Sequence, residues 1–336
     1  GDGTGNSQYV TKSGSMDDVY PAEKVFDMSD TAIVRNFRHL QNLDNKGAST
    51  IPGINYTKVS QANDIDWSDF VTKNETANGS NQINIYTQNN SKYSGNKKDC
   101  FLGIENNNIA TYEGNNCKIL NMVVDNTELT SDMLGTQDNN PYFAGLFRQS
   151  SAKITIQNLS LINPNISGYY SAAVIGHIAS GTDNTDKVSL TNVKVIGNLA
   201  INANLNNSSY GYAGGMIGYS GSNLNISASG MAASGSINGG QRTGGLIGGV
   251  DQSKTIKVNA STVTMQGLTI SGEYGAAGIL PDTNGGTVEL SGTNVLYANS
   301  GENITDNIIN GNSANAGGMI GTVSGGTTDL TSCVVG

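Results

Sequence analysis

Two hydrophobic patterns alternate along the second half of the chain. The first is a short motif of one or two small residues, two apolar residues and usually a glycine. The copies are separated by irregular distances, which indicates a shared strand core with loops of different length. The motif occurs six times, and its first apolar residues are Leu146, Val174, Met216, Leu246, Ile279 and Met319.

The second pattern is an alternation of apolar and polar residues between the motif copies. Its longest examples cover residues 154–161 and 188–195, and shorter ones occur at 224–226, 256–258 and 288–290. Alternation with period two predicts half-buried strands. Two positions beyond the second apolar residue the chain carries a small or turn-tolerant residue, which predicts a bend there. These bend residues are Asn158, Asn192, Ala228, Ala260 and Gly292. We expect an asparagine pair stacked across one rung but no continuous asparagine ladder.

Each repeat is therefore predicted to contain about three short strands separated by bends. One such unit cannot bury its own apolar side, whereas stacked units bury a continuous column. Asn-Gly hairpin signals do not occur regularly between the strands, so a coiled parallel sheet is favoured over a sandwich or barrel. The motif glycines are expected to permit close backbone approach and tight corners. No Gly-x-x-x-x-Gly-Lys-Ser/Thr sequence is present that would bind phosphate.

Residues 29–145 show a different pattern. Ser29-Asp30-Thr31 precedes apolar residues at helical spacing, namely Ile33, Val34, Phe37, Leu40 and Leu43. This predicts a short amphipathic helix from Thr31 to about Leu43, which would cap the open end of the strand column. We expect residues 1–28 to be a flexible segment and residues 29–145 to hold the capping helix and irregular first rungs. Residues 146–336 would form the repeat region, in one domain with the preceding part.

The composition agrees with many short strands and turns. Of the 336 residues 44 are glycine, and charged residues make up only 13%. Glycine disfavours long helices and tolerates positive φ. The net charge of −9 argues against nucleic acid as a partner. No apolar run approaches the ~20 residues that span a bilayer, so we expect no direct membrane insertion. The first residues, Gly1-Asp2-Gly3, suggest a chain from which a targeting segment has been removed.

Cysteine is rare in this chain. Cys100, Cys117 and Cys333 are too few for a disulfide scaffold. A Cys100–Cys117 bridge and three buried thiols are both compatible with the sequence, and the second is favoured.

The sequence predicts neither a metal site nor a cofactor. The two histidines, His39 and His177, lie too far apart in sequence to form a metal site by spacing. Asp183 and Asp186 share one polar loop, for which a solvated turn is favoured over calcium binding.

Three motif copies, at residues 214–218, 244–248 and 317–321, resemble the GLUG motif of bacterial cell-surface proteins. The upstream order is similar to such proteins as well: a helix-like segment, then residues 64–67, then residues 114–122. The Phe-Asp-Gly-Asn-Gly stretch that usually accompanies them has only degenerate counterparts at 101–107 and 113–115. The resemblance covers roughly residues 30–336. It implies a right-handed parallel β-helix on a secreted or surface-displayed, adhesin-like protein, and it implies no ligand and no catalytic residue.

An enzymatic function depends on the acidic residues. Parallel β-helices also host polysaccharide lyases and hydrolases, and a hydrolase needs two carboxylates on one face. The acids of the repeat region do not fall at equivalent positions. Asp64 and Asp66 alternate along a predicted strand and would share a face, so they are the catalytic candidates if the protein is an enzyme. The favoured alternative is an exposed strand face with Ile65 and Trp67 buried.

Tyrosines beside the motif are the candidates for ligand binding. A tyrosine ring offers a stacking surface and a hydroxyl at low entropic cost. The alternative, that these rings cover glycine-rich corners of the coil, stays open. The candidates are Tyr169, Tyr170, Tyr210, Tyr212, Tyr219 and Tyr274.

The sequence therefore predicts a non-enzymatic adhesion or interaction protein, extracellular or on the bacterial cell surface. Its partner would be a host or environmental glycan or protein. The alternative is a β-helix polysaccharide lyase or glycoside hydrolase.

Overall fold

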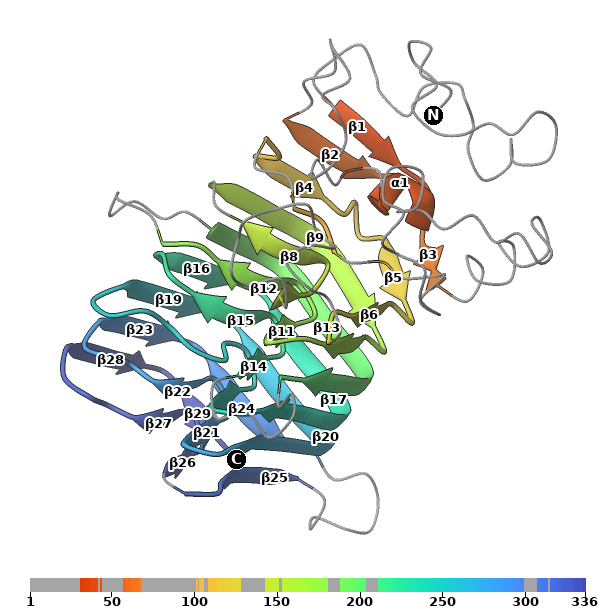
Figure 1. The fold of residues 1–336 in the computed structure, drawn as a ribbon. Coiled ribbons are helices and arrows are strands. Elements are labelled where there is room, and N and C mark those ends of the chain that lie inside the picture. The colour runs from red at the N-terminus through yellow and green to blue at the C-terminus, as the bar shows by residue number, and fades with distance from the viewer. Residues whose placement is uncertain are drawn as a thin grey trace, which may run out of the picture.

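The computed structural model describes residues 31–41, 43, 57–67, 101, 103–105, 108–127, 143–150, 153–180, 188–203, 211–298, 307–313 and 315–336. Within these ranges the chain is almost entirely β, and its strands pair in parallel (Figure 1). The predicted all-β class is therefore confirmed. The predicted flexible segment, residues 1–28, lies outside the described residues.

The strands belong to one large sheet and three small ones. The large sheet contains β1 (Thr31–Val34), β2 (Lys58–Gln61), β3 (Ile65–Asp66), β4 (Thr111–Glu113), β5 (Lys118–Leu120), β6 (Val123–Asp125), β9 (Ile154–Ile162), β10 (Asn165–Ser167), β13 (Val188–Asn202), β16 (Leu224–Ser227), β17 (Gly230–Gly239), β19 (Thr255–Asn259), β20 (Thr262–Gly272), β23 (Thr287–Ser291), β24 (Asn294–Tyr297), β25 (Ile308–Gly311), β28 (Thr327–Thr331) and β29 (Val334–Val335).

The three small sheets are built from the motif copies. The first contains β7 (Phe143–Ala144), β11 (Tyr170–Ala172), β14 (Tyr212–Gly214), β18 (Arg242–Gly244), β21 (Gly275–Ala277) and β26 (Asn315–Gly317). The second contains β8 (Phe147–Ser150), β12 (Ile175–Ile178) and β15 (Ile217–Ser220), and the third contains β22 (Leu280–Asp282) and β27 (Ile320–Thr322).

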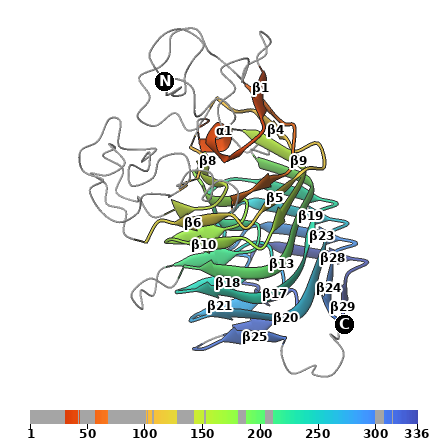
Figure 2. The same cartoon turned by 90° about the vertical axis from the view of Figure 1, so that its right-hand side faces the viewer.

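Each strand pairs with the equivalent strand of the next repeat, so equivalent residues lie on top of one another (Figure 2). The alternation seen in the sequence places every second side chain of a strand in the core. One buried column of the large sheet illustrates this register and consists of Ile119, Leu161, Val195, Met231, Val263 and Val295.

The motif copies form the corner between two small sheets. Their first apolar residues are buried in all six copies, because this position points into the column. Gly218 shows why small residues are needed: a Cβ at this position would approach the backbone nitrogen of Ser171 to 2.8 Å. Close backbone approach, as predicted, is the role of this glycine.

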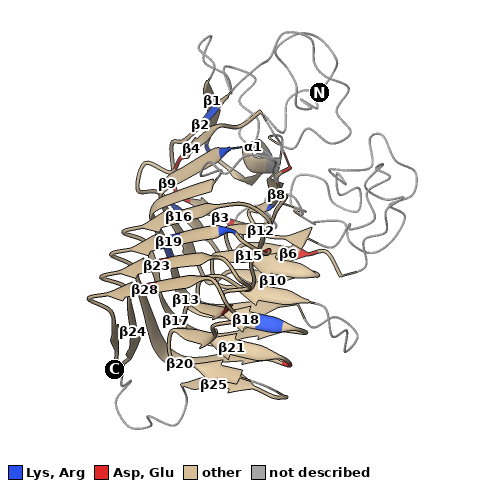
Figure 3. Ribbon diagram, turned by 90° about the vertical axis from the view of Figure 1, so that its left-hand side faces the viewer, with Lys and Arg blue, Asp and Glu red and all other residues tan. Residues whose placement is uncertain are grey.

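Charged residues are sparse along the strands (Figure 3). The apolar column continues to β24, where Val295 is fully buried. The last strands are more open, since Leu330 is 51% and Val334 53% exposed. Burial is therefore strongest where a strand has a neighbour on both sides.

The N-terminal end differs from the prediction. Thr31–Val34 is not helical but forms β1, which pairs in parallel with β2, and only α1 (Phe37–Gln41) is a helix. Every second side chain of β1 is buried, which is the alternation expected of a strand with one face on the core. The helix begins after Asn36, whose side-chain oxygen accepts a hydrogen bond from the backbone N–H of His39 at 3.0 Å. No helix in the described ranges is long and apolar enough to cross a membrane.

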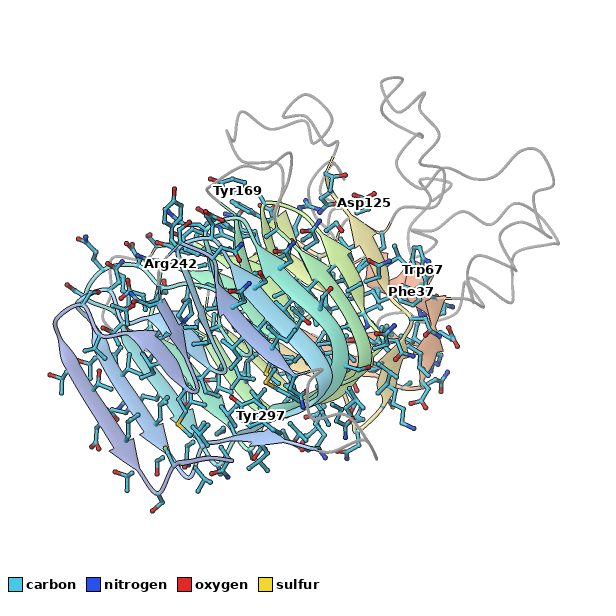
Figure 4. All side chains as sticks on the ribbon, turned by 90° about the horizontal axis from the view of Figure 1, so that it is seen from below. Phe37, Trp67, Asp125, Tyr169, Arg242 and Tyr297 are labelled. Atoms are coloured by element: carbon cyan, nitrogen blue, oxygen red, sulfur yellow. The ribbon has the colours of Figure 1, made fainter. Side chains whose placement is uncertain are left out.

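Aromatic rings fill the column beside α1. The ring of Phe37 packs edge-on against Trp67 at 4.8 Å and against Phe101 at 5.8 Å between ring centroids. Phe37 and Trp67 lie together at this end of the molecule (Figure 4). Leu40 and Leu43 are buried in the same core. The helical residues thus cover the apolar column here, although the helix is shorter than predicted.

The predicted bends are confirmed. Asn158, Asn192, Ala228, Ala260 and Gly292 all have φ between 46° and 54°, the left-handed region. The Asn192 side-chain amide donates to Asn158 Oδ1 at 2.9 Å, which is the expected stacked pair. Alanine has no side-chain group to compensate for this backbone conformation.

We predict that Ala228→Asn stabilises the fold by about 0.5–1 kcal/mol, because asparagine tolerates positive φ and can bond to Asn192. The measurement is the free energy of unfolding in urea. The control is Ala232→Asn, on the outer face of β17, where extended backbone gives asparagine no advantage. Equal effects of the two substitutions would contradict the prediction.

Candidate functional site

Two columns of side chains flank the motif corner, and all of them are partly buried except Phe143, which is buried. The first follows the six-stranded sheet, where Phe143, Tyr170, Tyr212 and Arg242 occupy successive repeats. The second follows the three-stranded sheet, where His177 and Tyr219 occupy successive repeats. We call the five rings of Phe143, Tyr170, His177, Tyr212 and Tyr219 the aromatic ladder. The register of the strands alone brings these residues together from segments far apart in sequence.

The rings of the ladder contact one another within and between the columns. Phe143 and Tyr170 are almost parallel, with centroids 5.1 Å apart, and Tyr170 stacks on Tyr219 at 5.0 Å. His177 lies 4.3 Å from Phe143. These separations follow from the ~4.8 Å spacing of neighbouring strands, so the ladder is a direct product of the parallel pairing of successive repeats.

Tyr212 is turned relative to the other rings. Its plane makes an angle of 75° with Tyr170 and 61° with Tyr219. The ring lies against Gly249, because a Cβ at that glycine would come within 2.6 Å of the Tyr212 Cε1 atom. Gly249 is the residue that follows Tyr219 in the second column, as the bridges on either side of it show. The absence of a side chain at Gly249 therefore allows the orientation of Tyr212.

The ladder is uncharged at neutral pH. Burial raises the pKa values of the Tyr170, Tyr212 and Tyr219 hydroxyls above their ordinary value, so all three keep their protons. Burial also lowers the pKa of His177 to about 4. The His177 Nδ1 atom is buried and has no hydrogen-bond partner within the described part of the chain. The surface thus offers neutral hydroxyl groups and rings.

Arg242, the fourth residue of the first column, takes part in an ion pair. Arg242 Nη2 lies 2.9 Å from Asp282 Oδ2, and the side chain of Arg242 is 27% exposed against 9% for Asp282. The other oxygen of Asp282 accepts hydrogen bonds from the backbone N–H of Asn284 at 2.8 Å and from the Ser324 hydroxyl at 2.5 Å. Asp282 is therefore held from several sides and orients the more exposed guanidinium.

Four of the six tyrosine candidates lie in or beside the ladder. Tyr169 contacts Tyr170 at 4.8 Å and lies on the same side of the molecule as Arg242 (Figure 4). Tyr274 is 47% exposed and makes no ring contact with a described residue. Tyr210 lies outside the described residues.

Sequence reasoning missed Phe143, His177 and Arg242. Each lies close to the first apolar residue of a motif copy. Phe143 and Arg242 precede that residue by three and four positions, and His177 follows it by three. Comparing these flanking positions between copies would have revealed both columns. The individual residue types gave no signal, because they differ from coil to coil.

The two acidic candidates bond to residues at the ends of the neighbouring strand β5. Asp64 Oδ1 accepts a hydrogen bond from the backbone N–H of Lys118 at 2.8 Å, and Asp66 Oδ1 accepts one from the Asn121 amide at 3.1 Å. Ile65 and Trp67 are buried between and beside them. Asp64 is exposed and Asp66 is partly exposed, and only Ile65–Asp66 form a strand, β3.

The described residues contain no group of three His, Cys, Asp or Glu side chains that could hold a metal ion. Asp183 and Asp186 lie outside the described residues. Cys117 and Cys333 are free thiols and only partly buried, which corrects the expectation of buried thiols for these two. Cys100 lies outside the described residues.

Comparisons with known proteins assign this chain to no family. No family model matches it, and no curated protein matches it. A solved structure of a candidate immunoglobulin A1 protease from Bacteroides ovatus superposes on 91% of this chain and 84% of its own, with a TM-score of 0.46 and 12% identity. A likeness at this level assigns neither a family nor an activity.

We predict that the fold loses stability as pH falls from about 6.5 toward 4. The lowered pKa of His177 means that the unfolded chain takes up a proton in this window before the folded chain does. Replacing His177 by Gln should remove about 2 kcal/mol of this loss. The measurement is the free energy of unfolding in urea at pH 7 and near pH 4.

His39 also contributes to the loss of stability in this pH range, because burial lowers its pKa to about 4 as well. It is unchanged in the His177→Gln variant, so its effect cancels in the comparison. Identical pH dependence of the variant and the wild type would show that His177 is not buried in neutral form.

Proposed function

We propose that this chain is a GLUG-like repeat protein of the bacterial exterior. Its coils would form a right-handed parallel β-helix that serves as a rigid platform for adhesion or interaction. The parallel pairing of each repeat with the next, and the motif copies at one corner, support this architecture. The resemblance of the motif copies to those of bacterial cell-surface proteins supports the location.

The observation that carries the proposed function is the aromatic ladder. Partly exposed rings on a stack of paired strands are already fixed before a ligand arrives, so little side-chain entropy is lost on binding. Tyrosine is enriched in binding surfaces for this reason, since it combines an apolar face with a hydroxyl. We propose that the ladder contacts a glycan or a protein of the host or environment.

The outer face of the large sheet is a weaker candidate for ligand binding. Its outward residues are mostly small and polar, as in the column of Thr155, Ser189 and Asn225. Such side chains provide few of the aromatic and arginine anchors that dominate binding energy. The ladder side therefore is the surface we assign to ligand binding.

We predict that the double variant Tyr212→Ala, Tyr219→Ala binds its ligand at least about tenfold more weakly than the wild type, a loss of about 1.4 kcal/mol. The measurement is retention of labelled protein on an array of purified glycans and extracellular-matrix proteins. The matched control is Tyr274→Ala, which removes an exposed tyrosine outside the ladder and should bind normally.

The melting temperatures of both variants should be compared with that of the wild type, so that lost binding is not confused with unfolding. If the folded double variant binds every array component as the wild type does, the ladder is not the binding surface.

A further inference from the structure

The charged groups around the aromatic ladder restrict the chemistry of its ligand. Arg242 occupies the position of Tyr212 one coil further along the stack. One of its terminal nitrogens bonds to Asp282. Its other N–H groups have no acceptor within the described ranges. A guanidinium held in this way presents donors in a fixed geometry next to Tyr212.

Glycines leave this ion pair open. Gly275 follows Arg242 in the first column, and a Cβ there would lie 3.8 Å from Arg242 Cγ. Gly249 takes the neighbouring position in the second column. Neither residue places a side chain over the guanidinium, so a ligand on Tyr212 can reach it.

The surface around the aromatic ladder carries no net positive charge. Asp282 compensates the charge of Arg242, and a second carboxylate, Asp251, lies close enough to Tyr170 and Tyr219 to add to the rise of their pKa values. Asp251 bonds to the backbone N–H of Gln252 at 2.8 Å and to the Ser180 hydroxyl at 3.3 Å. The whole chain carries −9. Such a surface disfavours an acidic polymer by like-charge repulsion.

We propose that the ligand of the aromatic ladder is a neutral, hydroxyl-rich linear glycan that lies along the stack of coils. Because Phe143 and Tyr219 stack against Tyr170, the sugar rings contact the exposed ring edges and hydroxyl groups of Tyr170, Tyr212 and Tyr219. The hydroxyl groups of the glycan bond to the Arg242–Asp282 pair. This assignment rests on the proposed function and specifies its ligand class. Protonated phenols suit such a ligand because each can both donate and accept a hydrogen bond.

The spacing of the ladder supports this direction of binding. Tyr170 and Tyr212 lie in successive repeats with a centroid separation of 5.4 Å, and the centroids of Tyr170 and Tyr219 are 5.0 Å apart. An extended glycan places successive sugar rings at a similar interval, so about one sugar corresponds to one coil. Affinity should therefore increase with the number of sugars until the glycan covers the ladder, and then level off.

The test is isothermal titration calorimetry of the whole chain with oligosaccharides of equal length. Cellohexaose, mannohexaose and xylohexaose are the neutral probes, and hexagalacturonic acid is the acidic probe. Each is measured at low and high salt. The variants are Tyr212→Ala, Arg242→Gln and Asp282→Asn. The control is Lys257→Gln, which removes a lysine of the large sheet paired with Glu289 at 3.3 Å.

We expect at least one neutral hexamer to bind about tenfold more tightly than hexagalacturonic acid, with an affinity that salt leaves unchanged within about twofold. Tyr212→Ala and Arg242→Gln should each weaken this binding at least about fivefold, whereas Lys257→Gln should not. Asp282→Asn leaves the positive charge of Arg242 uncompensated. This variant should therefore bind neutral and acidic hexamers with more similar affinities than the wild type does.

Tighter binding of hexagalacturonic acid, weakened by salt and by Tyr212→Ala, would overturn the neutral assignment and leave the proposed function intact. If no hexamer binds but an array protein is retained in a Tyr212-dependent way, the neutral-glycan assignment is likewise overturned and the proposed function stays intact. If neither glycans nor proteins bind in a Tyr212-dependent way, both the assignment and the proposed function are wrong.

Discussion

Parallel, in-register pairing of each repeat with the next is the constraint on which the rest of this structure depends. It places the side chains of paired residues above one another at the ~4.8 Å spacing of paired strands, with one register shift between β17 and β20. Apolar residues then form continuous buried columns, such as Leu161, Val195 and Met231. The same rule applied to partly exposed positions produces the Asn158–Asn192 pair and the aromatic ladder. Core and candidate site thus have one physical origin.

Local patterns in the sequence predicted much of this fold. Alternation identified β9 and β13, the motif identified the buried corners, and turn-tolerant residues identified the bends at Asn158 and Ala228. The helix at the N-terminal end was predicted too long, since the pairing of β1 with β2 is not local and helical spacing does not reveal it. The helix begins after Asn36, whose side chain caps it.

The candidate site was predictable only in part, for a related reason. Tyrosine chemistry identified Tyr170, Tyr212 and Tyr219, but their contacts depend on which strands become neighbours. Phe143 and His177 join the ladder through register and not through residue type. Arg242 becomes informative only beside Asp282, a residue of a later coil that fixes its orientation. Sequence alone therefore indicated the kind of side chain but not the surface that these side chains form.

The central claim is that the arrangement of the rings, and not only their presence, makes a binding surface. The most direct test is the affinity of Gly249→Ala for the ligand that the wild type retains. The added Cβ must displace the Tyr212 ring, whereas every aromatic residue and every strand pairing is kept. The account predicts that affinity falls nearly as far as in Tyr212→Ala, with little change in melting temperature. An unchanged affinity in the folded variant would contradict it.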